Sequence, residues 1–299
     1  MQKFVVCLVA RNENHVINEF VYHYIFSLKF DRVIIFDHLS DIPISNVLNQ
    51  RLSPHCDIIR ISKNKQIFLP HIDSGKKCEI TGNFQVGCYK HFLSSERSKQ
   101  FEWILIVDAD EFLTLPQHEN INDFINSFGS SKVHSIRFNW LCYGPSGHET
   151  QPTGTIMQNF RQRNKISHVL CNWTWNNFVK SMTKISMIDS NTYSQVHRVN
   201  VMDHVGAIVA PDGTNLSHLM HDEHNPPTGL HLGYIAHFIS LSYEHLENKR
   251  KLRLLTFPNY NLLTRQWIDD MFTKDNSECC NFVYERYGNK YENFLKHND

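Results

Sequence analysis

Two aspartates, Asp108 and Asp110, follow the most apolar segment of the chain, Trp103-Ile104-Leu105-Ile106-Val107. Side chains alternate along a strand, so carboxylates two residues apart at its end point the same way. Carboxylate oxygens are ligands that Mg²⁺ and Mn²⁺ prefer in proteins, and such an ion can neutralise a leaving diphosphate. An Asp-x-Asp triplet also occurs by chance or as the cap of a turn. Its place directly after this strand is what favours a metal site.

Polar side chains also follow two earlier apolar segments, residues 4–10 and 33–36. In chain order they are Arg11, Asn12, Glu13 and Asp37. Ligands of open α/β sheets lie beyond the carboxyl ends of the strands, so we expect Asn12, Asp37 and Asp108 along one rim. A structural interpretation stays open for Asp37, as a turn residue that binds its own backbone.

The segments that must position these residues alternate between strand and helix patterns. Short apolar runs predict strands at residues 4–10, 33–36, 56–61, 103–107 and 133–140. Apolar residues at three- and four-residue steps predict a helix at 16–28, and apolar spacing with many Glu, Lys and Arg residues predicts helices from Ser242 onward. Further helices are expected near 44–50, at 83–97 and at 120–128. Residues 62–82 and 141–155 are predicted loops. The predicted fold class is α/β, a Rossmann-like, mostly parallel twisted sheet flanked by helices, with a helical C-terminal tail.

The composition disfavours several kinds of protein. The 30 basic and 30 acidic side chains give zero formal charge, which argues against a surface for nucleic acid or an anionic bilayer. The 8 cysteines form no Cys-x-x-Cys pair, so we expect mostly buried, reduced thiols. The apolar start at residues 4–10 is far shorter than the ~20 residues that span a bilayer. We expect no transmembrane segment and a cytoplasmic location, unless an anchor precedes these residues.

Six segments of the sequence resemble the motifs of one enzyme family. They are Val9 to Glu13, Phe36 to Asp41, Asp108 to Phe112, Trp140 to Glu149, Lys180 to Lys184 and His237 to Ser242. In this order, over roughly residues 4–255, the chain resembles the GT2-like glycosyltransferases, especially glycosyltransferase family 92 (the DUF23 group). It departs from the family pattern at Arg11, where Lys is usual, at Phe238, where Tyr is usual, and at Leu241, where Lys is usual. The last change leaves no lysine for the diphosphate contact expected there.

The resemblance implies a GT-A domain that binds a nucleotide sugar and a divalent metal ion. Its nucleotide-sugar residues would be Arg11, Asn12, Glu13, Asp37, Asp108 and Lys180. Its metal ligands would be Asp108, Asp110 and His237, with Mn²⁺ or Mg²⁺ as the cofactor. Two other interpretations stay open: Glu13 as a charge that complements a helix start, and His237 as an ordinary core histidine.

The segment from Trp140 to Glu149 combines aromatic side chains with Gly and Pro turn formers. This composition suits a loop that stacks a sugar, and the residues predicted to bind the acceptor are Trp140, Gly147 and His148. Inverting transfer, which the resemblance implies, needs a base for the acceptor hydroxyl, and Glu149 and His148 are the candidates. The spacing leaves further aspartates open as alternatives: Asp203, Asp212 and Asp222. A strand end with buried aromatics and a tight turn is the plain structural interpretation.

These features predict a metal-dependent glycosyltransferase that moves a sugar from a nucleoside diphosphate sugar, preferably a UDP-sugar, to a carbohydrate or glycosylated acceptor. We expect the catalytic domain at residues 1–240, with a nucleotide half at about 1–115 and an acceptor half at about 116–240, and a helical extension at 241–299. The alternatives are a catalytically silent carbohydrate- or nucleotide-binding protein and a nucleotidyltransferase. The chain has no Gly-x4-Gly-Lys phosphate loop and no His-Glu-x-x-His motif, which disfavours the nucleotidyltransferase and a metal-dependent hydrolase.

Overall fold

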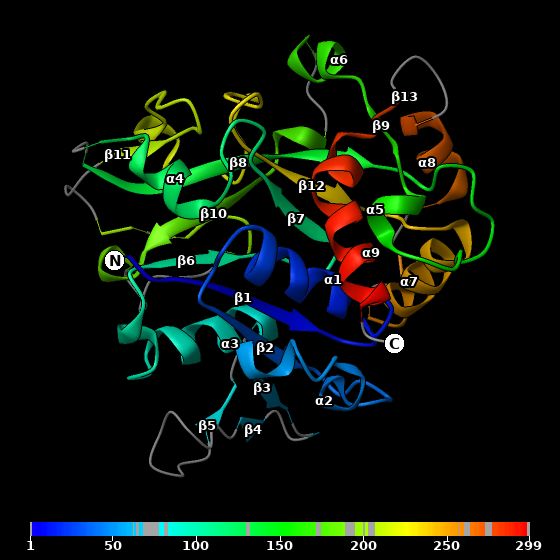
Figure 1. Ribbon diagram of the computed structural model, residues 1–299, viewed down its shortest axis with the longest axis horizontal. Helices are drawn as coiled ribbons and strands as arrows, with labels where there is room; N and C mark the ends of the chain where they lie inside the picture. The colour runs from blue at the N-terminus through cyan, green and yellow to red at the C-terminus, as the bar shows by residue number, and fades with distance from the viewer. Residues whose placement is uncertain are drawn as a thin grey trace. The chain divides into compact units, whose positions relative to one another are not determined.

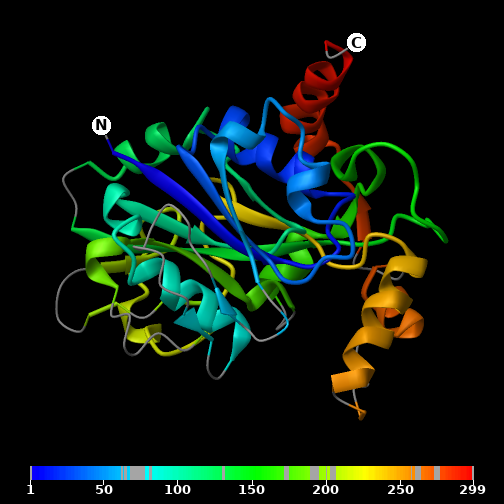
Figure 2. The ribbon, with the colours of Figure 1, turned by 90° about the horizontal axis from the view of Figure 1, so that it is seen from below.

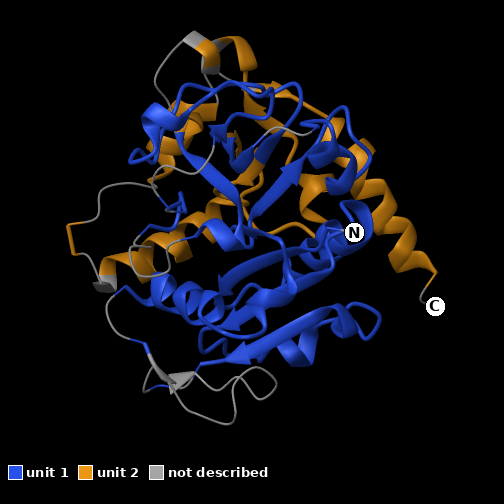
Figure 3. Ribbon diagram, turned by 90° about the vertical axis from the view of Figure 1, so that its left-hand side faces the viewer, with its two compact units in different colours: residues 1–139, 178–235 blue, residues 140–177, 236–299 orange. Residues whose placement is uncertain are grey.

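The computed structural model describes residues 2–61, 63, 66–67, 78–80, 83–129, 132–171, 175–188, 195–199, 201–202, 207–256, 258–259, 264–272 and 277–297. The chain divides into two compact units, each built from two separate segments (Figure 3). Unit 1 consists of residues 1–139 and 178–235, and unit 2 of residues 140–177 and 236–299. The functional division at about residues 115 and 240 stays a prediction.

Unit 1 contains most of the strands. They are β1 (Phe4–Ala10), β2 (Arg32–Asp37), β3 (Cys56–Arg60), β4 (Gln66–Ile67), β5 (Cys78–Glu79), β6 (Trp103–Ile106), β7 (Glu111–Thr114), most of β8 (Val133–Tyr143), β10 (Val179–Lys184) and β11 (Ala207–Val209). Its helices are α1 (Ile17–Tyr22), the π-helical η1 (His23–Ser27), α2 (Ile44–Val47), α3 (Phe84–Leu93) and α4 (Ile121–Asn126). Short 3₁₀ turns complete it: η2 (Ser53–His55), η3 (Ser98–Gln100), η5 (Ile185–Met187) and η6 (Ser217–Leu219).

Four strands of unit 1 form a parallel sheet in the order β3, β2, β1, β6 (Figures 1 and 2). Ala10 pairs with Asp37 and Cys7 with Ile106, so these strands end at one rim, as expected. Beyond β6, strand β10 runs antiparallel to both β6 and β8. The α/β class is confirmed, but this sheet is mixed rather than mostly parallel. Parallel neighbours need a long crossover connection, as between the strands from β1 to β6. Later in the chain, β11 also pairs parallel with β8.

Strand β1 separates two apolar layers of unit 1. Val5 and Cys7 face a cluster that includes Cys88 and Phe92 of α3. Phe4 points to the opposite face, where its ring centroid lies 6.0 Å from that of Phe30. A strand covered on both faces reads as a continuous apolar run, which is the pattern that predicted β1.

Helix α1 and the π-helical turn η1 together form the helix predicted at residues 16–28. Their buried face holds β7 in place. Tyr24 Oη donates to the carbonyl of Glu111 at 3.0 Å and accepts the N–H of Leu113 at 3.0 Å. Nε2 of His23 lies 2.8 Å from the carbonyl oxygen of Leu113. Burial lowers the pKa of His23 to about 3, so this imidazole is neutral and donates from Nε2.

Unit 2 carries the C-terminal helices. Its elements are the end of β8, α5 (Ile156–Asn159), β9 (Gln162–Asn164), α6 (Ile166–Cys171), η4 (Trp175–Asn177), most of β12 (Tyr234–Phe238), α7 (Tyr243–Thr256), α8 (Arg265–Phe272), β13 (Ser277–Cys279), η7 (Tyr284–Gly288) and α9 (Asn289–Lys296). The helical C-terminal tail is confirmed, with β13 as an interruption that pairs antiparallel with β9. The loop predicted from residue 141 is wrong over its first residues, because β8 continues to Tyr143, which pairs with Arg163.

Three thiols of unit 1 match the expectation from the sequence. Cys7, Cys56 and Cys88 are buried and free, and burial raises the pKa of Cys56 and of Cys88 to about 12. In unit 2 Cys142 is buried and free as well, whereas Cys279 is exposed. Across the described residues, no helix combines the length and the apolar character needed to cross a bilayer.

Candidate functional site

The two aspartates of the Asp-x-Asp triplet lie on a tight turn between β6 and β7. Strand β6 ends at Ile106, and the N–H of Glu111 donates to the carbonyl of Asp108 at 3.1 Å. The N–H of Asp108 donates to Oε2 of Glu111 at 2.8 Å, which closes the turn from the other side. Strand alternation therefore does not set the direction of these side chains, contrary to our expectation. The side chain of Asp108 is 36% exposed, and Asp110 is buried.

Lys180 on β10 joins this turn to the neighbouring strand. Its Nζ lies 3.0 Å from Oδ2 of Asp108 and 3.1 Å from Oε2 of Glu111, and its side chain is 1% exposed. A buried ammonium group is costly unless it is paired, and two carboxylates surround this one. Burial by itself would lower the pKa of Lys180, but Asp108 and Glu111 outweigh burial and raise it well above its ordinary value. Lys180 is therefore a charged residue that ties β10 to the turn.

The start of helix α3 supplies a further contact to Asp108. Oδ1 of Asn83 accepts the N–H groups of Gln85 at 3.1 Å and Val86 at 3.3 Å, which caps the helix. The cap brings Nε2 of Gln85 to 2.8 Å from Oδ1 of Asp108. Burial would raise the pKa of Asp108, but Lys180 outweighs it, so the pKa lies below its ordinary value. Asp108 is therefore ionised at neutral pH.

The donor set of this turn fits one hard divalent cation. The carboxylates of Asp108 and Glu111 flank the ammonium group of Lys180, and the buried Asp110 lies on the same turn, where its charge acts to raise the pKa of Asp108. Each oxygen of Asp108 accepts one hydrogen bond, whereas a carboxylate oxygen has two lone pairs. Among the described residues no cluster of three or more His, Cys, Asp or Glu side chains is arranged for a metal. A cation bound at this turn would therefore need oxygens from outside the turn, such as water or ligand oxygens, to complete its coordination shell.

Asn12 fastens the loop after β1 to the loop after β2. It adopts a left-handed backbone conformation with φ of 59°, and its N–H donates to Oγ of Ser40 at 2.9 Å. Its amide also exchanges two hydrogen bonds with Asp41, one of 3.0 Å through Nδ2 and one of 2.8 Å through Oδ1. The side chain of Asn12 thus holds the rim together, and nucleotide binding by it stays a prediction.

The carboxylate of Asp37 is buried and holds the turn that follows β2. Oδ1 accepts the N–H of Ser40 at 3.0 Å, and Oδ2 accepts the N–H of Ile44 at 3.2 Å. Nη1 of Arg60 lies 2.6 Å from the same Oδ2. These contacts fit the structural interpretation of Asp37 as a turn residue, and its role at a nucleotide stays a prediction.

Glu13 and Arg11 lie at the same rim. The carbonyl of Glu13 accepts the N–H groups of Val16 at 3.1 Å and Ile17 at 3.0 Å, where α1 begins. Its carboxylate lies 3.9 Å from Nε2 of His15. Arg11 is exposed. Both positions agree with the predicted rim, and nucleotide binding by either residue remains untested.

A stacked ring pair at this rim was missed by the sequence analysis. His38 follows Asp37, and its ring lies 3.8 Å from the ring of Phe84 at an interplanar angle of 25°. Both side chains are partly exposed. Burial and then the charge of Arg11 lower the pKa of His38, so the imidazole is neutral at pH 7. Gln85 and Phe84 gave no signal in the sequence, because neither belongs to a motif, whereas His38 and Glu111 lie inside motif segments to which the sequence analysis assigned no role for them.

The predicted acceptor residues belong to unit 2. Trp140 and His237 are both buried, with ring centroids 4.3 Å apart at an angle of 56°. The core interpretation of His237 thus has direct support within unit 2, whereas Asp108 and Asp110 belong to unit 1. Ligation of one ion by all three residues stays a prediction. Gly147 has φ of 82°, the left-handed conformation that a glycine adopts without strain in a tight turn.

The two candidate bases occupy different surroundings in unit 2. Nε2 of His148 lies 3.1 Å from the carbonyl oxygen of Asn159. Glu149 is exposed and forms two hydrogen bonds with the guanidinium group of Arg265, of 2.8 Å from Nη1 and 2.5 Å from Nη2. The hydrogen bonds from Arg265 lower the pKa of Glu149. This carboxylate is therefore ionised, but both of its oxygens accept hydrogen bonds from Arg265.

The other aspartates left open as bases belong to unit 1. Oδ1 of Asp212 accepts the N–H of Thr214 at 3.0 Å, as in a turn. Asp222 is exposed, and Asp203 lies outside the described residues.

Three solved structures illustrate what the chain is similar to. Two are glucosyl-3-phosphoglycerate synthase from Mycobacterium tuberculosis. One, with Mn²⁺, UDP and glucosyl-3-phosphoglycerate, is 12% identical with a TM-score of 0.40, covering 96% of this chain and 80% of that chain. The other, with Mn²⁺, UDP and phosphoglyceric acid, is 9% identical with a TM-score of 0.38, covering 70% and 68%. The third, a mycobacterial protein, is 13% identical with a TM-score of 0.35, covering 62% of this chain and 54% of its own length.

These structural similarities are too low to carry an argument about substrate. No curated protein sequence matches the chain. The profile of Glycosyltransferase family 92, however, matches residues 95–260, which is more than half of the chain and includes the turn of Asp108, Lys180 and the acceptor segment. The chain belongs to glycosyltransferase family 92.

Proposed function

We propose that this protein transfers a sugar from a nucleoside diphosphate sugar to a carbohydrate hydroxyl, with Mn²⁺ or Mg²⁺ at the turn of Asp108 and Asp110. The observation that carries the proposal is the partly exposed, ionised carboxylate of Asp108, which shares its turn with the buried Asp110. The family match supports the transfer of a sugar. UDP is the first donor nucleotide to test.

Within this proposal the residues of the turn hold the cation and the residues around them hold the turn. Asp108 and Asp110 would provide carboxylate oxygens to the ion, which when bound neutralises a leaving diphosphate. Gln85 and Lys180 fix the direction of the Asp108 carboxylate. Because Nζ of Lys180 is buried between two carboxylates, we revise its proposed role from a contact to the nucleotide sugar to the positioning of Asp108.

Glu149 remains our proposed base for the acceptor hydroxyl, in an inverting transfer. A base must be unprotonated, and the contact with Arg265 keeps Glu149 in that form. The same contact weakens it as a base, so an acceptor must displace Arg265 before a proton is taken. His148 is the second candidate, with Trp140 and Gly147 of the same segment as proposed acceptor contacts.

Calorimetry tests the donor site. We expect one nucleoside diphosphate, first UDP and then GDP, to bind with Mn²⁺ and to lose binding when EDTA replaces the metal. Asp108→Asn should weaken binding at least about tenfold, equivalent to about 1.4 kcal/mol. Asp123→Asn is the matched control, because that carboxylate bonds only within the start of α4 among its described contacts.

The outcomes of these titrations separate the alternatives. Equal binding in EDTA, or unchanged binding by Asp108→Asn, would contradict the proposed metal site. Metal-dependent binding with release of the nucleoside diphosphate from its sugar conjugate would support a transferase. Binding without such release would support the catalytically silent binding protein.

A further inference from the structure

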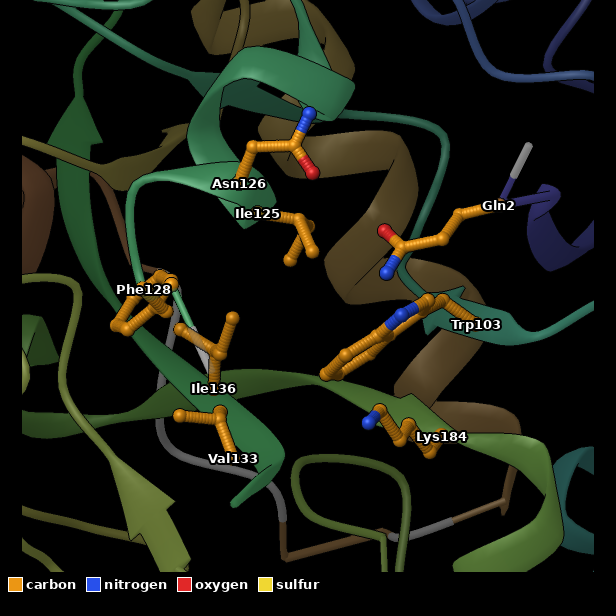
Figure 4. A pocket seen from close by; sticks show the side chains of 9 residues that line it. Gln2, Trp103, Ile125, Asn126, Phe128, Val133, Ile136 and Lys184 are labelled. Atoms are coloured by element: carbon orange, nitrogen blue, oxygen red, sulfur yellow. The ribbon is translucent and has the colours of Figure 1, made fainter. Parts of the chain in front are cut away.

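The small cavity beside the beginning of β6 does not require a ligand (Figure 4). Trp103 and Gln2 line it, and the indole Nε1–H and the amide Oε1 are both buried with no hydrogen-bond partner among the described residues. The Gln2 amide lies beside the indole nitrogen, so half a turn of this amide pairs the two groups. A surface open to a ligand lies at the opposite end of the parallel strands, where the partly exposed His38 follows β2.

Of the two stacked rings at this rim, His38 is the outer one. The ring of Phe84 packs against the apolar cluster that includes Val5 and Cys7 of β1. It also stacks on His38, with the ring centroids 3.8 Å apart at an interplanar angle of 25°. Phe84 is therefore held between the core and the imidazole, and the outer face of His38 is the one that can receive a further flat ring.

The backbone that carries His38 is fixed before any ligand binds. Leu39 has a left-handed backbone conformation with φ of 56°, which is rare for a leucine. This conformation is held by two hydrogen bonds of Ser40, one to the carboxylate of Asp37 and one from the N–H of Asn12. A preorganised ring loses little conformational freedom when a ligand stacks on it.

The ring pair shares helix α3 with a residue that holds Asp108. Phe84 and Gln85 are consecutive, so their Cα atoms are about 3.8 Å apart. Nε2 of Gln85 donates to Oδ1 of Asp108 at 2.8 Å. A nucleoside diphosphate whose phosphates lie at a cation on Asp108 carries its base one ribose away from those phosphates. The position of His38 therefore suits the base rather than the phosphates.

The protonation state of His38 also suits a base. Burial and then the charge of Arg11 lower the pKa of His38, so the imidazole is neutral at pH 7. An aromatic ring can stack on any nucleobase, because every base presents a π-face. The contact would therefore contribute affinity for a nucleotide without selecting between uracil and guanine.

We propose that the imidazole of His38, supported from behind by Phe84, stacks on the nucleobase of the donor. The inference rests on the proposed function, because it takes a nucleoside diphosphate as the ligand at the turn of Asp108. The bound base would form the third layer of a stack whose first two layers are Phe84 and His38.

Calorimetry with UDP and Mg²⁺ tests this stack. We expect His38→Ala to bind UDP at least about tenfold more weakly than the wild type, as for the loss of one base–aromatic contact. His38→Phe keeps a flat ring and should restore most of the affinity. Inorganic pyrophosphate has no base, so with Mg²⁺ it should bind equally to the wild type and to His38→Ala. GDP replaces UDP in the series if it is the nucleotide that the wild type binds.

His55→Ala is the matched control. His55 is also partly exposed and lies edge-on to a phenylalanine, Phe26, with ring centroids 5.3 Å apart. It precedes β3, at the end of the sheet away from the rim, so its variant should bind UDP like the wild type. In proton NMR spectra the uracil ring protons should move upfield with the wild type and less with His38→Ala, because ring currents act on groups stacked over a ring. Thermal unfolding confirms that each variant is folded.

Three outcomes would overturn the stack. Metal-dependent UDP binding that is equal in the wild type and His38→Ala would overturn it and leave the proposed function standing. A loss of pyrophosphate binding equal to the loss of UDP binding in His38→Ala would also overturn it, because the variant would then have distorted the phosphate site. No binding of UDP or GDP by the wild type would overturn both the stack and the proposed function.

Discussion

At the scale of single residues, the candidate donor site depends on one buried charge. Lys180 is 1% exposed and pairs with Asp108 and Glu111. These residues are distant in sequence from Lys180 and lie beside it because β10 pairs with β6. Gln85 holds the other oxygen of Asp108. The carboxylate that faces solvent is thus fixed from two sides before any cation binds, which reduces the entropic cost of binding.

We expect Glu111→Gln to lower both stability and metal-dependent nucleotide binding. The substitution keeps the shape but removes one of two negative charges beside the buried ammonium group, which should cost about 1–3 kcal/mol in the free energy of unfolding. Asp108 would then be the remaining carboxylate that balances the charge of Lys180, and it would bind a cation less strongly. Urea unfolding and calorimetry with Mn²⁺ measure the two effects.

The control for this variant is Glu119→Gln, which changes an exposed carboxylate on the same segment. It should alter the free energy of unfolding by less than about 0.5 kcal/mol. If Glu111→Gln were as stable as Glu119→Gln, Glu111 would not be the counter-charge that this geometry indicates.

At the scale of elements, the contact between η1 and β7 gives the fold a pH dependence. The pKa of His23 is about 3 in the folded protein and has an ordinary value of 6.5. Below pH 6.5 the unfolded chain takes up a proton that the folded chain does not. The contribution of His23 to stability is therefore complete above pH 6.5 and falls by about 1.4 kcal/mol per pH unit as the pH approaches 3.

The variant His23→Gln isolates this contribution, because its amide can still donate to Leu113 and does not titrate. We expect the free energies of unfolding of wild type and variant to converge as the pH falls from 7 to 4.5 in a series of urea denaturations. A constant difference across this range would show that His23 titrates normally in the folded protein.

The packing of helix α8 in unit 2 depends on the absence of one side chain. A Cβ atom added at Gly144, just after β8, would lie 2.5 Å from the ring of Phe272, which is itself buried. We expect Gly144→Ala to reduce the free energy of unfolding by about 1–3 kcal/mol through overpacking. Thermal or urea unfolding provides the measurement.

Phe272→Leu tests the cause of that loss. If the clash is with this ring, the double variant should be less destabilised than the sum of the two single variants, because the smaller side chain relieves the contact. Simple additivity would place the effect of Gly144→Ala elsewhere.

At the scale of the whole molecule, the chain passes between its two units three times. It leaves unit 1 after Asn139, returns at Phe178 and leaves again after Ile235. The family match at residues 95–260 therefore includes segments of both units. The proposed cation ligands Asp108 and Asp110 and their partners Gln85 and Lys180 all belong to unit 1.

Hydrogen exchange can test whether donor binding is confined to these elements. With UDP and Mn²⁺ we expect slower exchange in peptides that cover residues 83–89, 106–112 and 179–183, since their contacts converge on Asp108. The peptide at residues 284–297 of unit 2 should not change. Protection there, with none at 106–112, would contradict the proposed donor site.

Sequence patterns were sufficient for the elements whose residues are close along the chain. The apolar runs of β1 and β6, the helix at residues 16–28 and the rim that joins Asn12 to the loop after Asp37 were all expected and are present. These features follow from burial and periodicity, which local sequence records directly. The family motifs likewise identified residues 108–112 as a candidate site from local sequence alone.

Only the tertiary structure decided which groups surround that turn. Lys180 and Asp108 are 72 positions apart and meet because β10 pairs antiparallel with β6. The sequence predicted a mostly parallel sheet and two carboxylates that strand alternation points the same way, and it gave no role to Gln85 or Glu111. Strand order and long-range charge pairing depend on the free energy of the whole packed sheet. The local sequence around Asp108 therefore predicted the position of the turn but not the residues that contact it.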